Sequence, residues 1–253
     1  MLKIIVCIKA VPEYVDRVAV LQGQNKVKYE TTGLFMNESD EYAVEQAVAL
    51  KKQHGGEIAI ITMGPLASQD ALYKGLAQGA DKAIRIDADI ADPNSISEVL
   101  AMALRGMEYD LILTGVESRD NMASQVGISV AVRLGIPFAY AVTQVSHGEG
   151  QKFVRIVKEL GGGITQVMEI SVPALLCIQS GAVARTYISS QKILKARSRQ
   201  IESISLEDLG LRKEEGMKLV DIFLPKEKHQ VKFIQGQPKE VAAELIQKIR
   251  KGL

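Results

Sequence analysis

Apolar and polar positions follow two alternating patterns along the first 135 residues. Short continuous apolar runs, rich in β-branched residues, indicate strands buried on both faces at 2–8, 57–63, 82–86 and 109–115. Between them, apolar positions at helical spacing predict helices at about 40–53, 68–78, 93–107 and 124–134. An alternating stretch at 25–30 predicts a further short edge strand or hairpin. This β-α-β-α order predicts an α/β fold, a doubly wound, Rossmann-like parallel sheet covered by helices.

The pattern changes after Pro137. Strand-like segments separated by turn signals, with no helix between them, predict an antiparallel extension of the sheet at 139–146, 152–158, 163–171 and 174–179. A final helix is expected at 238–251, with Val241, Leu245, Ile246 and Ile249 on one face. Because the C-terminal stretch has only this one apolar face, it cannot form a hydrophobic core of its own. We therefore expect an α/β domain at 1–184, and a C-terminal arm within 185–253 that packs on a partner.

Charge and cysteine content narrow the function. The 253 residues carry 31 Lys+Arg and 30 Asp+Glu, and this near-neutral balance argues against a general nucleic-acid binder. Cys7 and Cys177 lie in apolar runs and are expected to be buried small hydrophobic residues in a reducing compartment. With neither a signal-peptide pattern nor an apolar run of 18 residues, the chain is expected to be cytoplasmic and not inserted in a membrane.

The sequence offers little for catalysis by side chains. Its histidines, His54, His147 and His229, occupy predicted loop or cap positions, and no Cys/His group has metal-ligand spacing. Neither a G-x-S-x-G nor a G-x-x-x-x-G-K-[ST] motif occurs. We therefore expect no catalytic residue and no metal site in this chain.

A ligand site is expected outside the carboxyl ends of the strands, near a topological switch point. The segments there are 7–14, 36–40, 63–65 and 115–127. Gly115 permits close backbone approach, and free N–H groups at the start of the following helix suit a phosphate. Neutral donors are available from Ser118, Asn121, Ser124 and Gln125, and a charge from Arg119.

The residues alone leave simpler alternatives open. In these alternatives Ser118 or Asp120 is only a helix N-cap, Asn37 and Asp40 form a capping-box-like helix start, and Lys9 is a solvated or interface charge. No G-x-G-x-x-G follows a strand, so a pyrophosphate bound in the dinucleotide manner is not expected. A second hypothesis is an adenine-nucleotide-dependent enzyme or sensor, which would need a triphosphate-binding loop after the first strand. That position reads CIKAVPEY and contains no glycine, which argues against this hypothesis. A purely structural scaffold is a third hypothesis.

Several separate motifs, in order over nearly the whole chain, resemble the beta subunit of electron transfer flavoproteins. They are KIIVCIKAVPEY, MNESDEYAVEQAVALK, ITMGP, GLAQGADKAIRI, DLILTGVESRDNMASQVGISVAVRLGIP, VKELGGGITQVMEISVPALLCI and KILKARSRQIESISLEDLGL. The resemblance implies a heterodimer with an alpha subunit that carries most of the FAD site. It also implies electron transfer from acyl-CoA or other flavin dehydrogenases to a downstream acceptor. The beta subunit would bind AMP or, in a bifurcating member, a second FAD in the same place.

The resemblance also implies individual site residues. Tyr14 matches a tyrosine near the alpha-bound flavin. The nucleotide would be lined by Cys7, Asn37, Glu38, Ser39, Asp40, Met63, Gly115, Ser118, Asp120, Asn121, Met122, Ala123, Ser124, Gln125 and Val126. Departures from the family pattern are Asn37-Glu38-Ser39-Asp40 in place of N-P-x-[DC], a reduced acidic run after Gly115, and Arg185-Thr186-Tyr187 in place of Pro-Arg-Tyr.

Residues 185–197 match the loop by which the family docks dehydrogenases. The usual anchoring leucine falls at Ser190, so Ile188 or Ile193 is expected to supply the apolar contact, next to Leu194 and Lys195. The basic residues of this segment are expected to steer association; they are Arg185, Lys192, Lys195, Arg197 and Arg199.

Overall fold

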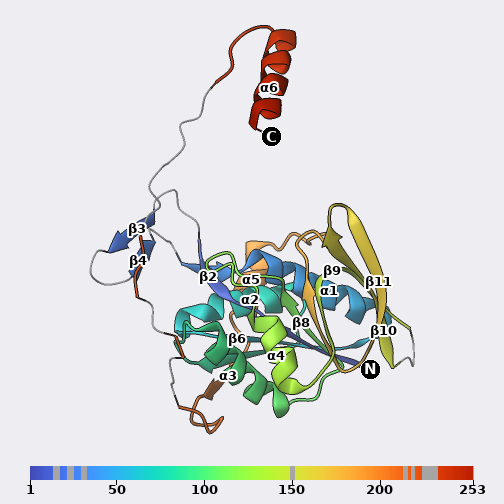
Figure 1. Ribbon diagram of the computed structural model, residues 1–253. Helices are drawn as coiled ribbons and strands as arrows, with labels where there is room; N and C mark the ends of the chain where they lie inside the picture. Colours follow the sequence, from blue (N-terminus) through green and yellow to red (C-terminus); the bar gives the residue numbers. More distant parts are fainter. Residues whose placement is uncertain are drawn as a thin grey trace. The chain divides into compact units, whose positions relative to one another are not determined.

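A computed structural model describes residues 1–13, 18–21, 26–29, 33–148, 152–212, 216–217, 220–223 and 233–252. It contains two compact units, one of Met1–Ala19 with Lys28–Leu219 and one of Val20–Val27 with Val220–Leu253. The first unit holds the large sheet (Figure 1). The second holds the C-terminal helix α6 (Pro238–Gly252).

The sheet has nine strands in the order β11-β10-β9-β12-β8-β1-β6-β7-β13. Their bounds are β1 Leu2–Cys7, β6 Gly56–Met63, β7 Lys82–Asp87, β8 Leu111–Gly115, β9 Phe138–His147, β10 Phe153–Gly161, β11 Ile164–Ser171, β12 Ala174–Ile178 and β13 Glu202–Ser205. From β9 to β13 in this order every pairing is parallel, whereas β10 pairs antiparallel with both β9 and β11. This confirms the expected doubly wound α/β sheet with an antiparallel extension.

Two helices cover each face of the sheet. α1 (Glu38–His54) and α2 (Gln69–Gln78), the latter preceded by the short helix η1 (Leu66–Ser68), pack on one face with Ile4, Val6 and Ile60. α3 (Pro93–Arg105) and α4 (Val126–Leu134) pack on the other face with Ile5 and Ile61. Because central strands such as β1 are buried on both sides, their sequences read as continuous apolar runs.

The chain winds in both directions from β1. It passes through α1 and α2 to β6 and β7 on one side, then returns through α3 to β8 on the other side of β1. The carboxyl ends of β1 and β8 therefore meet at the topological switch point, where open α/β sheets bind ligands.

Two strands of the large sheet differ from the sequence expectation. β12, predicted within the antiparallel extension, is parallel and lies between β8 and β9, because its residues ALLCI are all buried and suit an interior strand. β13 was not anticipated; it is a short polar edge strand paired with β7, and polar edge strands carry little apolar signal.

Two small sheets form ahead of α1. β2 (Ala10–Pro12) pairs antiparallel with β5 (Leu34–Met36), a pairing that the sequence did not indicate. β3 (Val18–Leu21) and β4 (Lys26–Tyr29) form a two-stranded sheet, which confirms the strand expected at 25–30 within its described residues.

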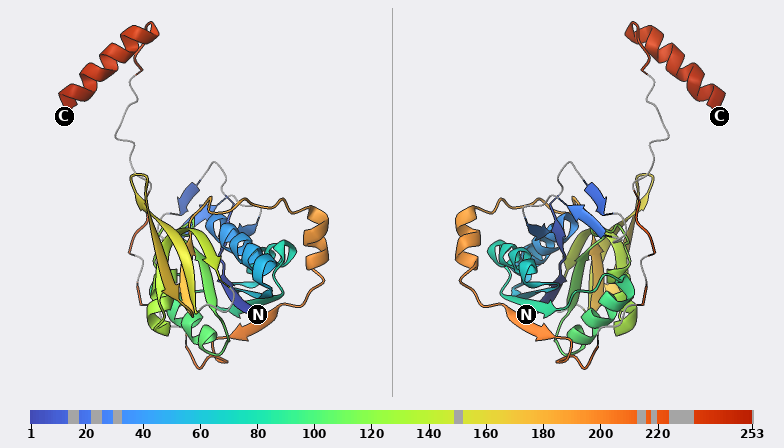
Figure 2. Two further views of the ribbon diagram at one scale, coloured as in Figure 1. Left: turned by 90° about the vertical axis from the view of Figure 1, so that its right-hand side faces the viewer. Right: turned by 90° about the vertical axis from the view of Figure 1, so that its left-hand side faces the viewer.

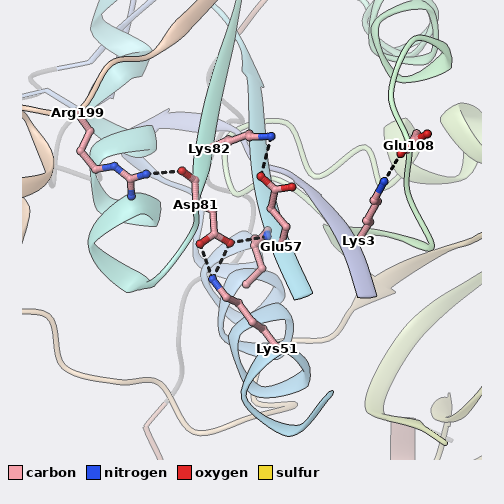
Figure 3. Close-up of polar contacts among 8 residues, drawn as sticks. Lys3, Lys51, Glu57, Asp81, Lys82, Glu108 and Arg199 are labelled. Carbon is pink, nitrogen blue, oxygen red and sulfur yellow. Dashed lines mark hydrogen bonds and ion pairs between the residues drawn. The ribbon is translucent and has the colours of Figure 1, made fainter. Parts of the chain in front are cut away.

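Ion pairs occupy the amino-terminal edge of the large sheet (Figure 3). Lys82 pairs with Glu57 at 2.7 Å, Lys3 pairs with Glu108, and the Asp81 carboxylate accepts from Lys51 Nζ and from the Ile58 N–H. These lysines are therefore matched by carboxylates, and the cavity described below lies at the opposite, carboxyl-terminal edge.

The segment after β12 stays on the first unit. α5 (Ser190–Ala196) packs beside α2, as Figure 2 shows, before the chain enters β13. That residues 185–253 act as a docking loop and a partner-bound arm remains a prediction. None of the described helices is long and apolar enough to cross a membrane.

Candidate functional site

A cavity of about 150 Å³ lies at the switch point. Its floor is formed by the ends of β1 and β8, one side by the first turn of α1 and another by the loop that leads into α4. α3 and the connection before it close the cavity with an apolar wall of Ile90, Pro93, Ile96 and Leu100. The cavity thus combines a polar side near a helix N-terminus with an apolar side, a combination typical of small-molecule sites.

Asp40 ties the two central strands together. One carboxylate oxygen accepts from the Gly115 N–H at 2.8 Å, and the other accepts from the Lys9 N–H at 2.8 Å. Burial raises the pKa of Asp40 to about 6, although these two N–H donors favour the ionised form. The carboxylate is therefore a structural link between the loops after β1 and β8.

Asn37 fixes the loop that follows β8. Its amide nitrogen donates to the Glu117 carbonyl at 2.8 Å, and its amide oxygen accepts from the Arg119 N–H at 3.0 Å. The alternative that Asn37 and Asp40 form a capping box is therefore wrong: the Asn37 side chain makes no cap bond to α1, and both side chains turn toward the 115–125 loop.

The beginning of α4 is open. Gln125 is its N-cap residue and makes no side-chain cap bond, and Gln125, Val126 and Gly127 line the cavity. The N-cap alternatives for Ser118 and Asp120 are therefore wrong. Uncapped N–H groups in the first turn of a helix, at its positive dipole end, suit an anion.

Two glycines permit close packing around the cavity. A Cβ at Gly115 would lie 2.5 Å from Ser39 Cβ and 2.6 Å from Asp40 Oδ1. A Cβ at Gly127 would lie 2.7 Å from Thr114 Oγ1 and 2.8 Å from Cys177 Sγ. Only glycine therefore lets α1 and α4 approach the strand ends this closely.

Lys9 forms an ion pair beside the cavity. Its Nζ lies 2.7 Å from an Asp120 carboxylate oxygen and 3.3 Å from Ser118 Oγ. Lys9 is therefore paired within this chain, and its place at an interface with a partner stays a prediction. Because Lys9 neutralises Asp120, that acid does not present an uncompensated negative charge to an anion in the cavity.

The two cysteines are free and buried, as expected. Burial raises the pKa of Cys7 to about 12 and that of Cys177 to about 11. Both thiols therefore stay protonated at neutral pH, and neither is an activated nucleophile.

Most predicted site residues meet at this cavity. Those that line it are Cys7, Asn37, Asp40, Met63, Gly115, Ser118, Asn121, Ala123, Ser124, Gln125 and Val126. Glu38, Ser39, Asp120 and Met122 do not line it: Ser39 Oγ lies 3.2 Å from Ser180 Oγ, and Met122 is exposed. Tyr14 lies outside the described residues.

Sequence reasoning missed the apolar wall and Thr114. The remaining lining residues fall within the segments 7–14 and 115–127 expected at the site; they are Ile8, Lys9, Val116, Glu117 and Gly127. The wall belongs to the connection after β7 and to α3. The wall could have been predicted from the order of the elements, because α3 connects β7 to β8 across the switch point and must therefore pass the cavity.

The predicted docking residues lie on α5 and the loop before it. Ile188 and Ile193 are half-buried, Ser190 and Lys195 are exposed, and Leu194 exposes 71% of its surface. Tyr187, which was not singled out as an anchor, exposes 86%. Three of the basic residues bind within the protein: Arg185 with Glu41, Arg197 with Asp70, and Arg199 with backbone carbonyls.

Comparison with known proteins identifies the family. The model of the electron transfer flavoprotein domain matches residues 26–209. The chain is 34% identical to the electron transfer flavoprotein subunit beta of Bacillus subtilis over 233 residues, which cover 89% of each chain. It is 32% identical to that of Methylophilus methylotrophus over 84% of each chain, and 28% identical to the acryloyl-CoA reductase electron transfer subunit gamma of Anaerotignum propionicum over 98% of each. The chain belongs to the electron transfer flavoprotein family, among its beta subunits.

Proposed function

We propose that this chain is the beta subunit of a heterodimeric electron transfer flavoprotein in the cytoplasm. It binds AMP in the switch-point cavity and helps an alpha subunit hold the FAD that carries electrons from flavin dehydrogenases to a downstream acceptor. The chain itself acts as part of a carrier, without catalytic residues of its own. The observation that carries the nucleotide assignment is the uncapped start of α4, facing a cavity with one apolar wall.

The residues suit a nucleoside monophosphate. The N–H groups at the start of α4 would receive the phosphate, with Gln125 as a neutral donor. The wall of Ile96 and Leu100 offers an apolar surface to a flat base. Of the two acids near the phosphate position, Asp120 is compensated by Lys9, whereas Glu117 accepts a 3.1 Å hydrogen bond from the neutral Ser124 hydroxyl. These features support one phosphate, hence AMP in preference to a second FAD.

The alpha subunit is the partner proposed for α6. Leu245, Ile246 and Ile249 leave about half of their surfaces exposed along one face of this helix. An amphipathic helix without an apolar partner is stabilised by packing against another chain. Co-expression should then give a 1:1 complex with an obligate-type interface of more than ~2,000 Å².

Nucleotide content tests the function. The complex co-purified with the alpha subunit is denatured, and the released nucleotides are quantified by chromatography. One FAD and one AMP per heterodimer are expected. Two FAD and no AMP would contradict the AMP assignment and indicate a bifurcating member, whereas a complex without flavin would contradict the carrier function.

A further inference from the structure

Two glutamates of α1 connect three elements. Glu41 accepts from Lys74 of α2 with one oxygen and from Arg185 Nη1 with the other, at 3.2 Å. One turn later Glu45 accepts from Gln78 of α2 at 3.2 Å and from Thr186 Oγ1 at 3.0 Å. The result is a two-step ladder in which each glutamate joins α2 to the start of the docking segment, residues 185–199.

Arg185 makes further contacts with the same helix face. Its guanidinium lies 5.3 Å from the ring centroid of Tyr42, within cation–π range, and 3.8 Å from a Glu38 carboxylate oxygen. Arg185 is therefore held by two carboxylates and an aromatic ring. A residue held in this way is a poor candidate for a steering charge, because its field is compensated at short range.

The other end of the docking segment is held in a similar manner. Arg197 pairs with Asp70 at 2.9 Å and lies 5.9 Å from the Tyr73 ring centroid of α2. Between these two attachments the exposed apolar side chains are Tyr187 and Leu194. The attachments thus fix both ends of a short segment that presents two apolar side chains outward.

We propose that Arg185 is a positioning residue, which through Glu41 and Tyr42 holds residues 186–196 in the conformation that docks the electron-donating dehydrogenase. This inference rests on the proposed carrier function and assigns to Arg185 a role other than charge steering. A preorganised segment loses less conformational entropy when it binds, so loss of the attachment should weaken docking without changing the bound nucleotides.

The test uses the FAD- and AMP-loaded heterodimer and an acyl-CoA dehydrogenase as donor. Arg185→Gln should raise the KM for the heterodimer about three- to tenfold, the range given by an exposed ion pair together with a cation–π contact. The kcat and the rate of reduction by dithionite should stay unchanged. Arg155→Gln, which removes an exposed positive charge from β10, is the matched control and should leave the KM unchanged.

A double-mutant cycle distinguishes the effect of the Arg185–Glu41 contact from that of the Arg185 charge. If the contact with Glu41 carries the effect, Arg185→Gln and Glu41→Gln should each raise the KM, and the double variant should not exceed the larger single effect. Equal KM values for Arg185→Gln and the wild type would overturn the proposal. So would an equal rise with Arg155→Gln, since that outcome indicates general charge steering.

Proteolysis of the same heterodimers reports on the segment directly. In Arg185→Gln, trypsin should cleave after Lys192 and Lys195 faster than in the wild type, as measured by mass spectrometry. If the wild-type heterodimer accepts no electrons from any dehydrogenase, the proposed function fails. Faster cleavage would even then support the attachment of the segment by Arg185, and unchanged cleavage would overturn it.

Discussion

The Asp40 carboxylate accepts a hydrogen bond from the Gly115 N–H at 2.8 Å and thereby joins α1 to the end of β8. The second carboxylate oxygen accepts from Lys9, which follows β1. A single buried side chain thus holds together the two strand ends that form the floor of the cavity. The geometry requires a backbone without a side chain at position 115, because α1 occupies the space where a Cβ would lie.

Gly115→Ala should therefore disturb both the fold and the nucleotide site. The new Cβ would lie 2.5 Å from Ser39 Cβ, so α1 and the loop must separate. We expect a loss of ~1–3 kcal/mol in the free energy of unfolding, the usual range for overpacking, together with loss of AMP. Urea unfolding and nucleotide analysis of the heterodimer measure both. Gly106→Ala is the control, since its Cβ would meet only Ala103 O at 3.8 Å; similar losses in both variants would refute this explanation.

Asp40 also predicts a pH dependence. Burial raises its pKa from 3.8 to about 6, so the folded protein binds a proton there more tightly than the unfolded chain does. The resulting contribution to the free energy of unfolding is complete below pH 3.8 and is lost as the pH rises through about 6. Asp40→Asn lacks this titration. The difference in unfolding free energy between wild type and variant should therefore change between these pH values, and a carboxyl that titrates near 3.8 by NMR would contradict the prediction.

Much of the fold follows from local patterns. The central strands β1, β6 and β8 are buried apolar runs, and α1 ends before Gly55 as its sequence indicates. The partners of β12 and β13 do not follow from local patterns, because pairing depends on which strand the crossovers bring alongside. Strand direction in the second half of the sheet therefore required the structure.

The candidate site, too, could be predicted only in part from the sequence. The sequence placed the 36–40 and 115–127 segments at one sheet edge, and the structure brings them together around one cavity. Local capping rules failed for Asn37 and Asp40, because tertiary N–H donors from Lys9, Gly115 and Arg119 compete for their oxygens. The ion pair of Lys9 could not be predicted from local sequence either, because its partner Asp120 lies 111 positions away along the chain.

The Lys9–Asp120 pair predicts an effect on anion binding. Lys9→Met would leave the Asp120 carboxylate without its partner beside the phosphate position, so AMP affinity should fall by at least about tenfold, which corresponds to ~1.4 kcal/mol. Lys9→Met/Asp120→Asn should recover most of the affinity, because the repelling charge is gone. Calorimetric titration of the AMP-depleted heterodimer measures both. If the double variant binds as weakly as the single one, Lys9 contacts the nucleotide directly.

The apolar face of α6 predicts the strength of assembly. Leu245→Gln together with Ile249→Gln should destabilise the heterodimer, since each leucine or isoleucine buried in an interface contributes ~1.5–3 kcal/mol. Analytical ultracentrifugation over a dilution series would show dissociation at higher concentration than for the wild type. Lys248→Gln on the same helix breaks only an exposed pair with Glu244 and should assemble normally. Unchanged dissociation of the double variant would place the partner elsewhere.

The exposure of side chains between 188 and 194 favours a different anchor for the dehydrogenase from the two expected from the sequence. Ile188 and Ile193 are half-buried within this chain, whereas Leu194 exposes 71% of its surface. Leu194→Ala should therefore weaken docking by ~1–3 kcal/mol through a faster off-rate, with FAD and AMP retained. Ile188→Ala and Ile193→Ala should act mainly on the stability of the segment.

Charge reversal at Lys192 and Lys195 should slow electron transfer chiefly at low ionic strength. Stopped-flow reduction by the dehydrogenase measures each variant, and wild-type rates in all of them would locate docking on another surface.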